Sequence, residues 1–173
     1  MDNQGRHLRR TRETDLPDPL LHVALYQPEI PPNTGNIGRL CLGLELRLHL
    51  IGPLGFSTSD KAVRRAGLDY WKHVDLVEHA DPAAFFGWLG DRRVHLLSTK
   101  GSTNYTQVRF EPGDVLLFGP ESVGLPDALV ARFGALRIPM WGPIRSLNLS
   151  NAVSVVVYEA LQQLVPGRFG IES

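Results

Sequence analysis

Residues 115–126 read Val-Leu-Leu-Phe-Gly-Pro-Glu-Ser-Val-Gly-Leu-Pro, a short apolar run that passes directly into a loop of turn-forming and polar residues. Four consecutive apolar residues bounded by turn signals are typical of a strand that is buried on both faces of a sheet. Comparable apolar runs predict further strands at 21–26, 46–51, 74–77, 94–97 and 136–138. We therefore expect a sheet that helices cover on both sides.

Helical patterns separate most of these runs. They predict helices from Asn33 to Leu44, from Asp60 to Gly67, over 82–89 and over 150–164. We expect Asn33 or Thr34 to cap the first helix, Asp81 to precede the third and Ser150 to cap the last. Strands that alternate with helices predict a single-domain α/β fold with a mainly parallel sheet, in which ligands bind beyond the carboxyl ends of the strands.

The composition is that of an ordinary globular protein. The chain has 173 residues, of which 43% are hydrophobic, and its 18 Lys and Arg residues balance its 18 Asp and Glu residues. A formal net charge of zero excludes a protein that holds nucleic acid by bulk positive charge, so any RNA contact must be local. We expect one domain over 20–166, a polar, arginine-bearing tail over 1–19 and a short tail over 167–173.

The sequence also limits the compartment and the partners. No stretch reaches the ~18–20 apolar residues of a membrane span, and 1–19 lacks the apolar segment of a secretory signal. Cys41 is the only cysteine, which excludes an intramolecular disulfide and a thiolate zinc cluster. The six histidines show no metal-ligand spacing. We therefore expect a cytoplasmic protein with neither a membrane nor a metal partner.

Three loops, at 33–39, 118–126 and 138–151, concentrate Gly, Pro, Asn and Ser after apolar runs. The glycine fingerprints of dinucleotide and nucleoside-triphosphate sites are absent, and so is the G-x-S-x-G turn of α/β hydrolases. Tight turns and helix caps use the same residue types. Residue types alone therefore leave both a ligand site and a purely structural role open for each loop.

Four motifs, in order along the chain, carry a resemblance to a known family. They are Glu29-Ile30-Pro31-Pro32-Asn33-Thr34-Gly35-Asn36, Arg64-Arg65-Ala66-Gly67-Leu68-Asp69-Tyr70, Phe118-Gly119-Pro120-Glu121 and Arg145-Ser146-Leu147-Asn148-Leu149-Ser150-Asn151-Ala152-Val153-Ser154. From Leu21 to about Gln163 the chain resembles the SPOUT methyltransferases, and most narrowly the bacterial group that methylates the ribose 2′-hydroxyl of the tRNA wobble nucleotide, a cytidine or uridine. The resemblance implies a deep C-terminal trefoil knot, S-adenosylmethionine as cofactor, the tRNA anticodon stem-loop as substrate and a homodimer formed partly through the last helix.

The resemblance also implies roles for individual residues. It implies that S-adenosylmethionine is bound by Leu97, Gly119, Ile138, Ser146 and Leu147. It implies catalytic positions at Asn33, Arg39, Glu121, Ser150 and Asn151. It implies RNA contacts at Arg145 and Tyr158. The basic cluster at Lys61, Arg64 and Arg65 predicts further RNA contacts at Arg64 and Arg65, with a solvated helix face as the alternative.

Arg39 completes the N-x-G-x-x-x-R spacing that begins at Asn33. A guanidinium stays protonated in proteins and accepts no proton, so we expect Arg39 to stabilise the developing alkoxide or to position a phosphate. The group that takes the proton of the 2′-hydroxyl stays open. Three roles are open for Glu121: orienting Arg39, orienting the positive end of the cofactor, or capping a helix near Pro126.

Two further features leave alternatives open. We interpret Arg92 and Arg93 as part of a solvated helix face. On the last predicted helix, Val153, Val157 and Leu161 form an apolar stripe that fits either a dimer contact or an internal core. Two other functions stay possible. One is a ribose methyltransferase acting on another tRNA position or on ribosomal RNA, and the other is a non-catalytic RNA-binding module.

Overall fold

A computed structural model describes residues 19–58 and 68–170. Within these residues seven strands form one sheet, and every pairing between neighbouring strands is parallel. The order across the sheet is β3-β2-β1-β6-β4-β7-β5. The α/β fold with a mainly parallel sheet is therefore confirmed, and the carboxyl ends of all strands lie at one end of the sheet. The strands are β1 (His22–Tyr26), β2 (Arg47–Ile51), β3 (Leu76–His79), β4 (Val94–Leu97), β5 (Thr103–Asn104), β6 (Val115–Phe118) and β7 (Leu136–Arg137).

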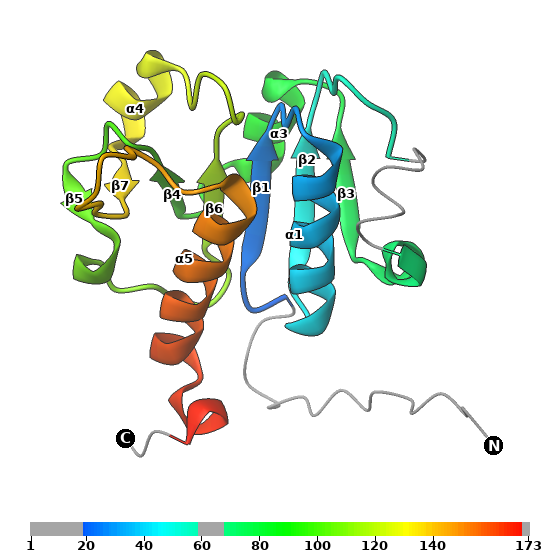
Figure 1. The fold of residues 1–173 in the computed structure, drawn as a ribbon. Helices are drawn as coiled ribbons and strands as arrows, with labels where there is room; N and C mark the ends of the chain where they lie inside the picture. Colours follow the sequence, from blue (N-terminus) through cyan, green and yellow to red (C-terminus); the bar gives the residue numbers. More distant parts are fainter. Residues whose placement is uncertain (1–18, 59–67, 171–173) are drawn as a thin grey trace.

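Helices cover both faces of this sheet. Figure 1 shows α1 and α5 side by side in front of the strands and α3 behind them, with α4 at the upper left. Two hydrophobic clusters match these layers, because α1 and α5 contribute to one and α3 and α4 to the other. None of the helices in the described part of the chain is both long and apolar enough to cross a bilayer. The helices are α1 (Pro31–Gly43), α3 (Pro82–Leu89), α4 (Asp127–Phe133) and α5 (Leu149–Leu164), with 3-10 helices η1 (Leu68–His73), η2 (Tyr105–Gln107) and η3 (Pro166–Phe169).

The central strand β1 supplies both cores. Val23 and Leu25 pack in the cluster beneath α1 and α5, whereas Ala24, between them, packs with Phe85 of α3. Successive side chains of a strand point to opposite faces, so an uninterrupted apolar run fills both layers. Full burial of a Val, Leu or Phe side chain contributes about 1.5–3 kcal/mol, and this burial is what holds the helices on the sheet.

Several predicted elements are confirmed, but the start of the first helix is not where we expect it. The runs at 94–97 and 115–118 are β4 and β6, and Asp81 caps α3 by accepting a hydrogen bond from a backbone N–H at 2.8 Å. α1 begins at Pro31, so the prediction that Asn33 or Thr34 caps it is wrong. Proline is favoured in a first helical turn because the N–H that it lacks has no helical partner there.

The last helix also begins earlier than predicted. α5 is capped by Asn148, whose Oδ1 accepts a hydrogen bond from the backbone N–H of Ser150 at 2.9 Å, so the prediction of Ser150 as the cap is wrong. Asn and Ser are both good caps, and the earlier of the two is used. β3 lies two residues later than the predicted strand at 74–77. The helix predicted from Asp60 to Gly67 lies outside the described residues, and the trefoil knot stays a prediction.

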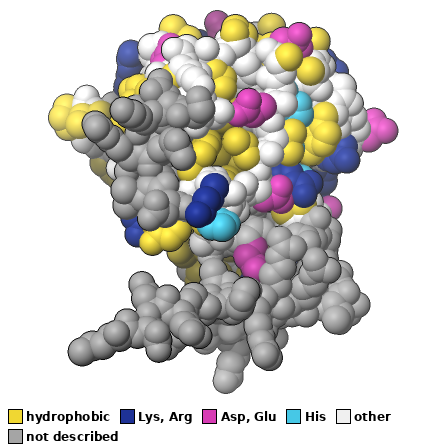
Figure 2. Space-filling view, turned by 90° about the vertical axis from the view of Figure 1, so that its right-hand side faces the viewer, with side chains coloured by type: hydrophobic (Ala, Val, Ile, Leu, Met, Phe, Trp, Pro, Cys, Tyr) yellow, Lys and Arg dark blue, Asp and Glu magenta, His cyan; other side chains and the backbone are white. Residues whose placement is uncertain are grey.

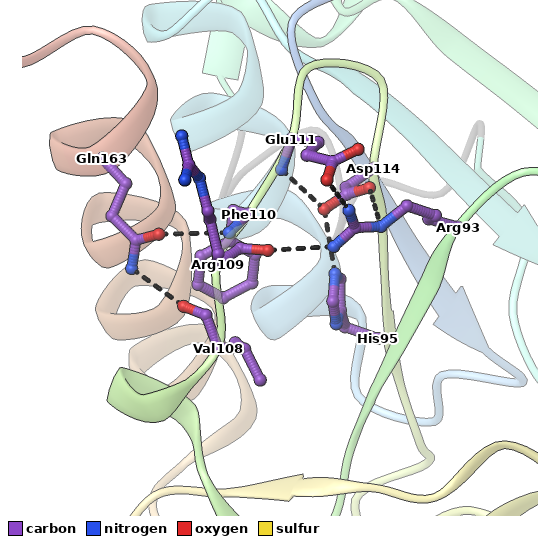
Figure 3. A network of polar contacts seen from close by, with 8 residues as sticks. All are labelled: Arg93, His95, Val108, Arg109, Phe110, Glu111, Asp114 and Gln163. Carbon is purple, nitrogen blue, oxygen red and sulfur yellow. Dashed lines mark hydrogen bonds and ion pairs between the residues drawn. The ribbon is translucent and has the colours of Figure 1, made fainter.

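A polar network holds the opposite end of the sheet, at the amino ends of β4 and β6 (Figure 3). The buried carboxylate of Asp114 accepts hydrogen bonds from the backbone N–H of Glu111 at 2.8 Å and from His95 Nε2 at 2.9 Å. Arg93 forms ion pairs with both Asp114 and Glu111. Arg93 therefore has a structural role that the interpretation as a solvated helix face missed.

The same network reaches α5 (Figure 3). Gln163 accepts a hydrogen bond from the backbone N–H of Phe110 at 3.1 Å and donates one to the carbonyl of Val108 at 3.2 Å. The loop between η2 and β6 is thereby tied to both α5 and β4. This end of the molecule is structural, and the loops of interest lie at the other end.

Candidate functional site

The loops that follow β4, β6 and β7 enclose a cavity of about 390 Å³ at the carboxyl ends of the strands. Apolar side chains from three strand ends form part of its wall, and polar loop residues form the rest. Its volume lies within the ~300–1,000 Å³ range of sites for small organic ligands. The lining residues are Ile30, Asn33, 97–100, 118–125, Leu136, Ile138, 145–149 and Ala152.

All five positions that we expect to hold a cofactor meet at this cavity. Leu97 ends β4, Gly119 follows β6, Ile138 follows β7, and Ser146 and Leu147 precede α5. They come together because β6, β4 and β7 are neighbours in the sheet and run parallel. The fold thus places residues that are far apart in the sequence on the wall of one cavity.

Gly119 allows two parts of the β6 loop to approach each other closely. A Cβ atom at this position would lie 2.4 Å from the backbone nitrogen of Leu125 and 2.6 Å from the backbone carbon of Gly124. Both contacts are with backbone, which does not swing aside as the end of a long side chain does. Any larger residue would therefore displace residues 124–125, which form part of the cavity wall.

Glu121 fixes the loop between β1 and α1 against the β6 loop. Its Oε2 accepts a hydrogen bond from the backbone N–H of Glu29 at 2.8 Å, and its Oε1 accepts from the N–H of Ile30 at 3.2 Å and from Asn33 Nδ2 at 3.1 Å. A carboxylate is favourable here because the N–H groups at the start of a helix lack helical partners. Among hydrogen bonds between described residues, none joins Glu121 to Arg39 or to α4.

Glu29 makes the reverse connection between the same two loops. Its carboxylate accepts hydrogen bonds from the backbone N–H of Ser122 at 2.8 Å and from Ser122 Oγ at 2.7 Å. Each loop thus presents a carboxylate to the backbone of the other. This reciprocal pairing fixes the edge of the cavity between β1 and β6.

Asn33 connects this pair of loops to a third. It is buried in the first turn of α1, and its Oδ1 accepts a hydrogen bond from Asn148 Nδ2 at 3.0 Å while its Nδ2 donates to Glu121. Asn148 is also the cap of α5. One buried amide therefore links the start of α1, the β6 loop and the start of α5.

The remaining catalytic positions implied by the resemblance do not line this cavity. Arg39 and Asn151 are exposed on α1 and α5, and Ser150 Oγ donates to Asn148 Oδ1 at 2.7 Å. Tyr158, on the same helix as Asn151, is 44% exposed and also lies away from the cavity.

Of the expected RNA contacts that the structure describes, one lies at the cavity and one lies away from it. Arg145 lines the cavity and is exposed. Tyr158 lies on α5 with its ring centroid 6.0 Å from that of Phe169. Arg64 and Arg65 lie outside the described residues.

Chemically, the cavity suits an organic ligand that is partly apolar and partly polar. Leu97, Ile138 and Leu147 offer surfaces on which a flat ring can pack, while the loops offer hydroxyl and carboxylate groups at the edge. Among the described residues, no group of three or more His, Cys, Asp or Glu side chains is arranged to hold a metal ion.

Sequence reasoning missed the parts played by Glu29, Ser122 and Asn148. All three stand in segments that we singled out, but none of them was expected to connect one loop to another. The signal that could have identified Glu29 is its place directly before the helix start at Ile30-Pro31, where a carboxylate can bind a neighbouring loop. The partner loop is supplied only by the pairing of β1 with β6.

Comparison with known proteins identifies the class. A model of the SpoU rRNA Methylase family matches residues 20–158, and the chain therefore belongs to this family of methyltransferases. A curated relative from Escherichia coli (strain K12), the tRNA (cytidine(34)-2′-O)-methyltransferase, is 50% identical over 148 residues, which cover 84% of this chain and 94% of that protein. The resemblance to SPOUT methyltransferases, and to their wobble-nucleotide group, is confirmed.

Solved structures agree with this classification. A structure described as "Structural insights into the 2-OH methylation of C/U34 on tRNA" is 54% identical, with a TM-score of 0.82, and the match covers 86% of this chain and 97% of that chain. An AdoMet-bound rRNA methyltransferase from Sinorhizobium meliloti is 28% identical, with a TM-score of 0.78, and the match covers 86% of this chain and 58% of that chain.

Proposed function

We propose that the protein transfers a methyl group from S-adenosylmethionine to the ribose 2′-hydroxyl of the wobble nucleotide, cytidine or uridine, in the anticodon loop of a tRNA. The observation that carries this proposal is that all five expected cofactor positions line one and the same cavity, in a chain 50% identical to a tRNA (cytidine(34)-2′-O)-methyltransferase. A cytoplasmic location, where tRNA is matured, is part of the proposal.

The cavity fits the cofactor in size and chemistry. Its volume of about 390 Å³ accommodates a folded nucleoside with an amino-acid tail, and Leu97, Ile138 and Leu147 supply apolar surface for an adenine ring. The close approach of the chain at Gly119 shapes the wall against which such a ligand would lie. When bound, S-adenosylmethionine supplies an activated methyl group on a sulfonium.

The residues of this chain supply alignment and charge. Methyl transfer to an oxygen is an in-line displacement, so holding the 2′-oxygen opposite the methyl group contributes much of the rate. Glu121 has hydrogen bonds from three groups, which suits positioning of the loops better than proton transfer. Arg39 would stabilise the negative charge that develops on the ribose oxygen.

A homodimer explains why Arg39 does not line the cavity of its own chain. Arg39 stands six residues after Asn33 on α1, and at 3.6 residues per turn its side chain points about 120° away from that of Asn33. Arg39, Asn151 and Tyr158 lie instead on exposed sides of α1 and α5, which are neighbours (Figure 1). We propose that α1 and α5 face a second copy, so that these side chains reach the partner's cavity.

Complementation tests this arrangement. The Ser146→Trp variant fills the cavity, and the Arg39→Ala variant removes the guanidinium, so each homodimer should be inactive. In a mixture, half of the dimers are mixed and one of their two sites is intact, so we expect recovery of about a quarter of the wild-type activity. Absence of recovery, with mixed dimers detected by mass spectrometry, would contradict the shared site.

The charge distribution favours an exposed RNA loop over a duplex as the substrate. The net charge is zero, and Figure 2 shows acidic and basic side chains interspersed among hydrophobic ones on the side of the molecule where β3 lies. Among the described residues on that side no continuous basic surface is visible. Single-stranded loops are recognised through splayed bases and a few contacts, whereas a duplex is gripped along its phosphates.

A tRNA that lacks a single oxygen atom tests the assignment of the wobble ribose as the methyl acceptor. A tRNA that carries 2′-deoxyribose only at the wobble nucleotide keeps the base and the fold but lacks the acceptor oxygen. We expect no methyl transfer to this tRNA and normal transfer to the matched all-ribose tRNA. Equal transfer to both would overturn the wobble assignment, and transfer to ribosomal RNA alone would favour that substrate instead.

A further inference from the structure

The guanidinium of Arg39 lies over the aromatic ring of Tyr70. The guanidinium carbon is 5.5 Å from the ring centroid, within the ~6 Å over which a cation is attracted by the face of an aromatic ring. Tyr70 lies on η1 and is 45% exposed, so the pair is at the surface. The resemblance assigns no role to Tyr70.

The position of Tyr70 is fixed by its neighbour Trp71. A Cβ atom at Gly38 would lie only 2.5 Å from the Trp71 ring, so the ring packs directly on α1 where Gly38 leaves space. Trp71 packs against the main hydrophobic cluster, and its carbonyl accepts a hydrogen bond from the N–H of Val74 at 3.1 Å. The residue next to Trp71 is Tyr70, and the residue next to Gly38 is Arg39, so this docking brings the two together.

Contact with the ring of Tyr70 leaves N–H donors of Arg39 available. A guanidinium carries five N–H donors arranged as a fork, so contact with one aromatic ring does not occupy all of them. A free arginine side chain has many rotamers, and restricting them beforehand reduces the ordering that binding requires. The contact with Tyr70 therefore orders Arg39, while N–H donors remain that can reach a ribose or phosphate oxygen.

We propose that Tyr70 is a positioning residue for Arg39. Its ring attracts the guanidinium and restricts the orientation of that group, so that the remaining N–H donors are held for the substrate RNA. This inference rests on the proposed function, in which Arg39 acts on the ribose or a phosphate. It requires the aromatic ring of Tyr70, and it does not require the hydroxyl.

The test compares variants that keep or remove the ring. Tyr70→Phe keeps the aromatic face, Tyr70→Leu removes it at similar bulk, and His73→Ala is a control at an exposed position on the same 3-10 helix. With saturating cofactor, we expect kcat/KM for tRNA to fall about threefold to tenfold in Tyr70→Leu and to stay within about twofold in the other two variants. The dissociation constant for S-adenosylmethionine should not change in any of them.

A spectroscopic arm tests the contact independently of activity. In the wild type, ring currents of Tyr70 should shift the side-chain NMR signals of Arg39, assigned by their loss in Arg39→Lys. The shift should persist in Tyr70→Phe and disappear in Tyr70→Leu. Absence of a ring-current shift, or a Tyr70→Phe variant as impaired as Tyr70→Leu, would overturn the inference.

The two arms separate this inference from the proposed function. If the wild-type protein transfers no methyl to tRNA, the proposed function fails, whatever the NMR signals show. If transfer occurs and Tyr70→Leu keeps wild-type kcat/KM, the proposed function stands and the positioning role is wrong.

Discussion

At the scale of single residues, Asn33 illustrates how a buried amide organises a site. Its two polar atoms bind different loops, the Glu121 carboxylate on one side and the Asn148 amide on the other. Both hydrogen bonds are part-buried, and a typical intramolecular hydrogen bond contributes about 0.5–1.5 kcal/mol, so losing the two together costs about 1–3 kcal/mol. Asn33 is therefore as important for holding the cavity as for any direct contact with a ligand.

Replacing Asn33 tests this role. We expect Asn33→Ala to lower the free energy of unfolding by about 1–3 kcal/mol and to weaken S-adenosylmethionine binding by about tenfold, since two loops of the cavity lose a common partner. Denaturant unfolding and calorimetry measure the two effects. Asn36→Ala, at an exposed position of the same helix, is the matched control and should change neither.

Gly119 offers a second test at this scale. In Gly119→Ala the new methyl group meets the backbone of Gly124 and Leu125, so the wall of the cavity must move. We expect cofactor affinity, measured by calorimetry, to fall by at least about tenfold, as when the geometry of a largely pre-formed site is lost. Gly142→Ala is the control, because a Cβ there meets nothing within 4 Å. An unchanged affinity in Gly119→Ala would contradict the described wall.

At the scale of elements, the start of α5 combines two functions in one residue. Asn148 caps the helix through Oδ1 and reaches Asn33 through Nδ2. An ordinary cap such as Asp81 on α3 has only the first function. The position of α5 is thus coupled to the first turn of α1, and these two helices carry the exposed residues that we assign to the dimer.

Cap variants separate the two functions. Asp81→Ala should cost about 1 kcal/mol of stability and leave transfer intact, because only a helix end loses a hydrogen bond. Asn148→Ala should cost about 1–3 kcal/mol, since the cap and the link to Asn33 are both lost, and should reduce methyl transfer. Thermal unfolding and a transfer assay decide between these outcomes. Equal behaviour of the two variants would show that Asn148 is only a cap.

The elements also show how far sequence reasoning reaches. The runs that became β4 and β6 are uninterrupted and apolar, so burial on both faces identifies them without tertiary knowledge. α4 was expected only as a helix near Pro126, without bounds, because it is short, and β5 escaped prediction because it is a pair of residues, too short for any periodicity. The cap of α5 was misplaced because two cap-forming residues, Asn148 and Ser150, stand close together. The start of α1 was misplaced because this helix begins at prolines ahead of Asn33, without a side-chain cap.

The candidate site was also predictable only in part, because the sequence identifies strand ends but not the direction of exposed side chains. Residues at strand ends can be recognised, and parallel pairing brings Leu97, Gly119 and Ile138 together. The sequence does not specify which direction an exposed helical side chain faces relative to another loop. That is why the catalytic role expected for Arg39 did not reveal that it lies away from the cavity lining, and why Tyr70 was quoted in a motif without a role.

At the scale of the whole molecule, a chain of buried histidines crosses the sheet beneath α3. His22 Nδ1 lies 3.0 Å from His49 Nε2, and His49 Nδ1 lies 2.9 Å from His79 Nε2. The ring centroids of His49 and Trp88 are 4.1 Å apart, with the rings tilted by 38°. Burial lowers the pKa of His22 to about 4, with a smaller contribution from the positive charges of nearby arginines. Burial, followed by the other two histidines, lowers the pKa of His49 to about 2.

These histidines make stability depend on pH. Their pKa is lower in the folded state than in the unfolded chain, so below pH 6.5 the unfolded chain binds more protons and is favoured as pH falls. Between about pH 6.5 and pH 5 each of the two should remove on the order of 2 kcal/mol from the free energy of unfolding. Urea unfolding across this range measures the slope, which should be shallower in His49→Gln. A flat profile from about pH 7.5 to pH 5 would show that the histidines are not buried in their neutral form.

The measurement that tests the central claim most directly is transfer of a labelled methyl group from S-adenosylmethionine to unmodified tRNA by the purified protein, followed by nuclease digestion and mapping of the labelled nucleotide. We predict label on the ribose of the wobble nucleotide. Label on a base, on another nucleotide, or only on ribosomal RNA when both RNAs are offered would contradict it.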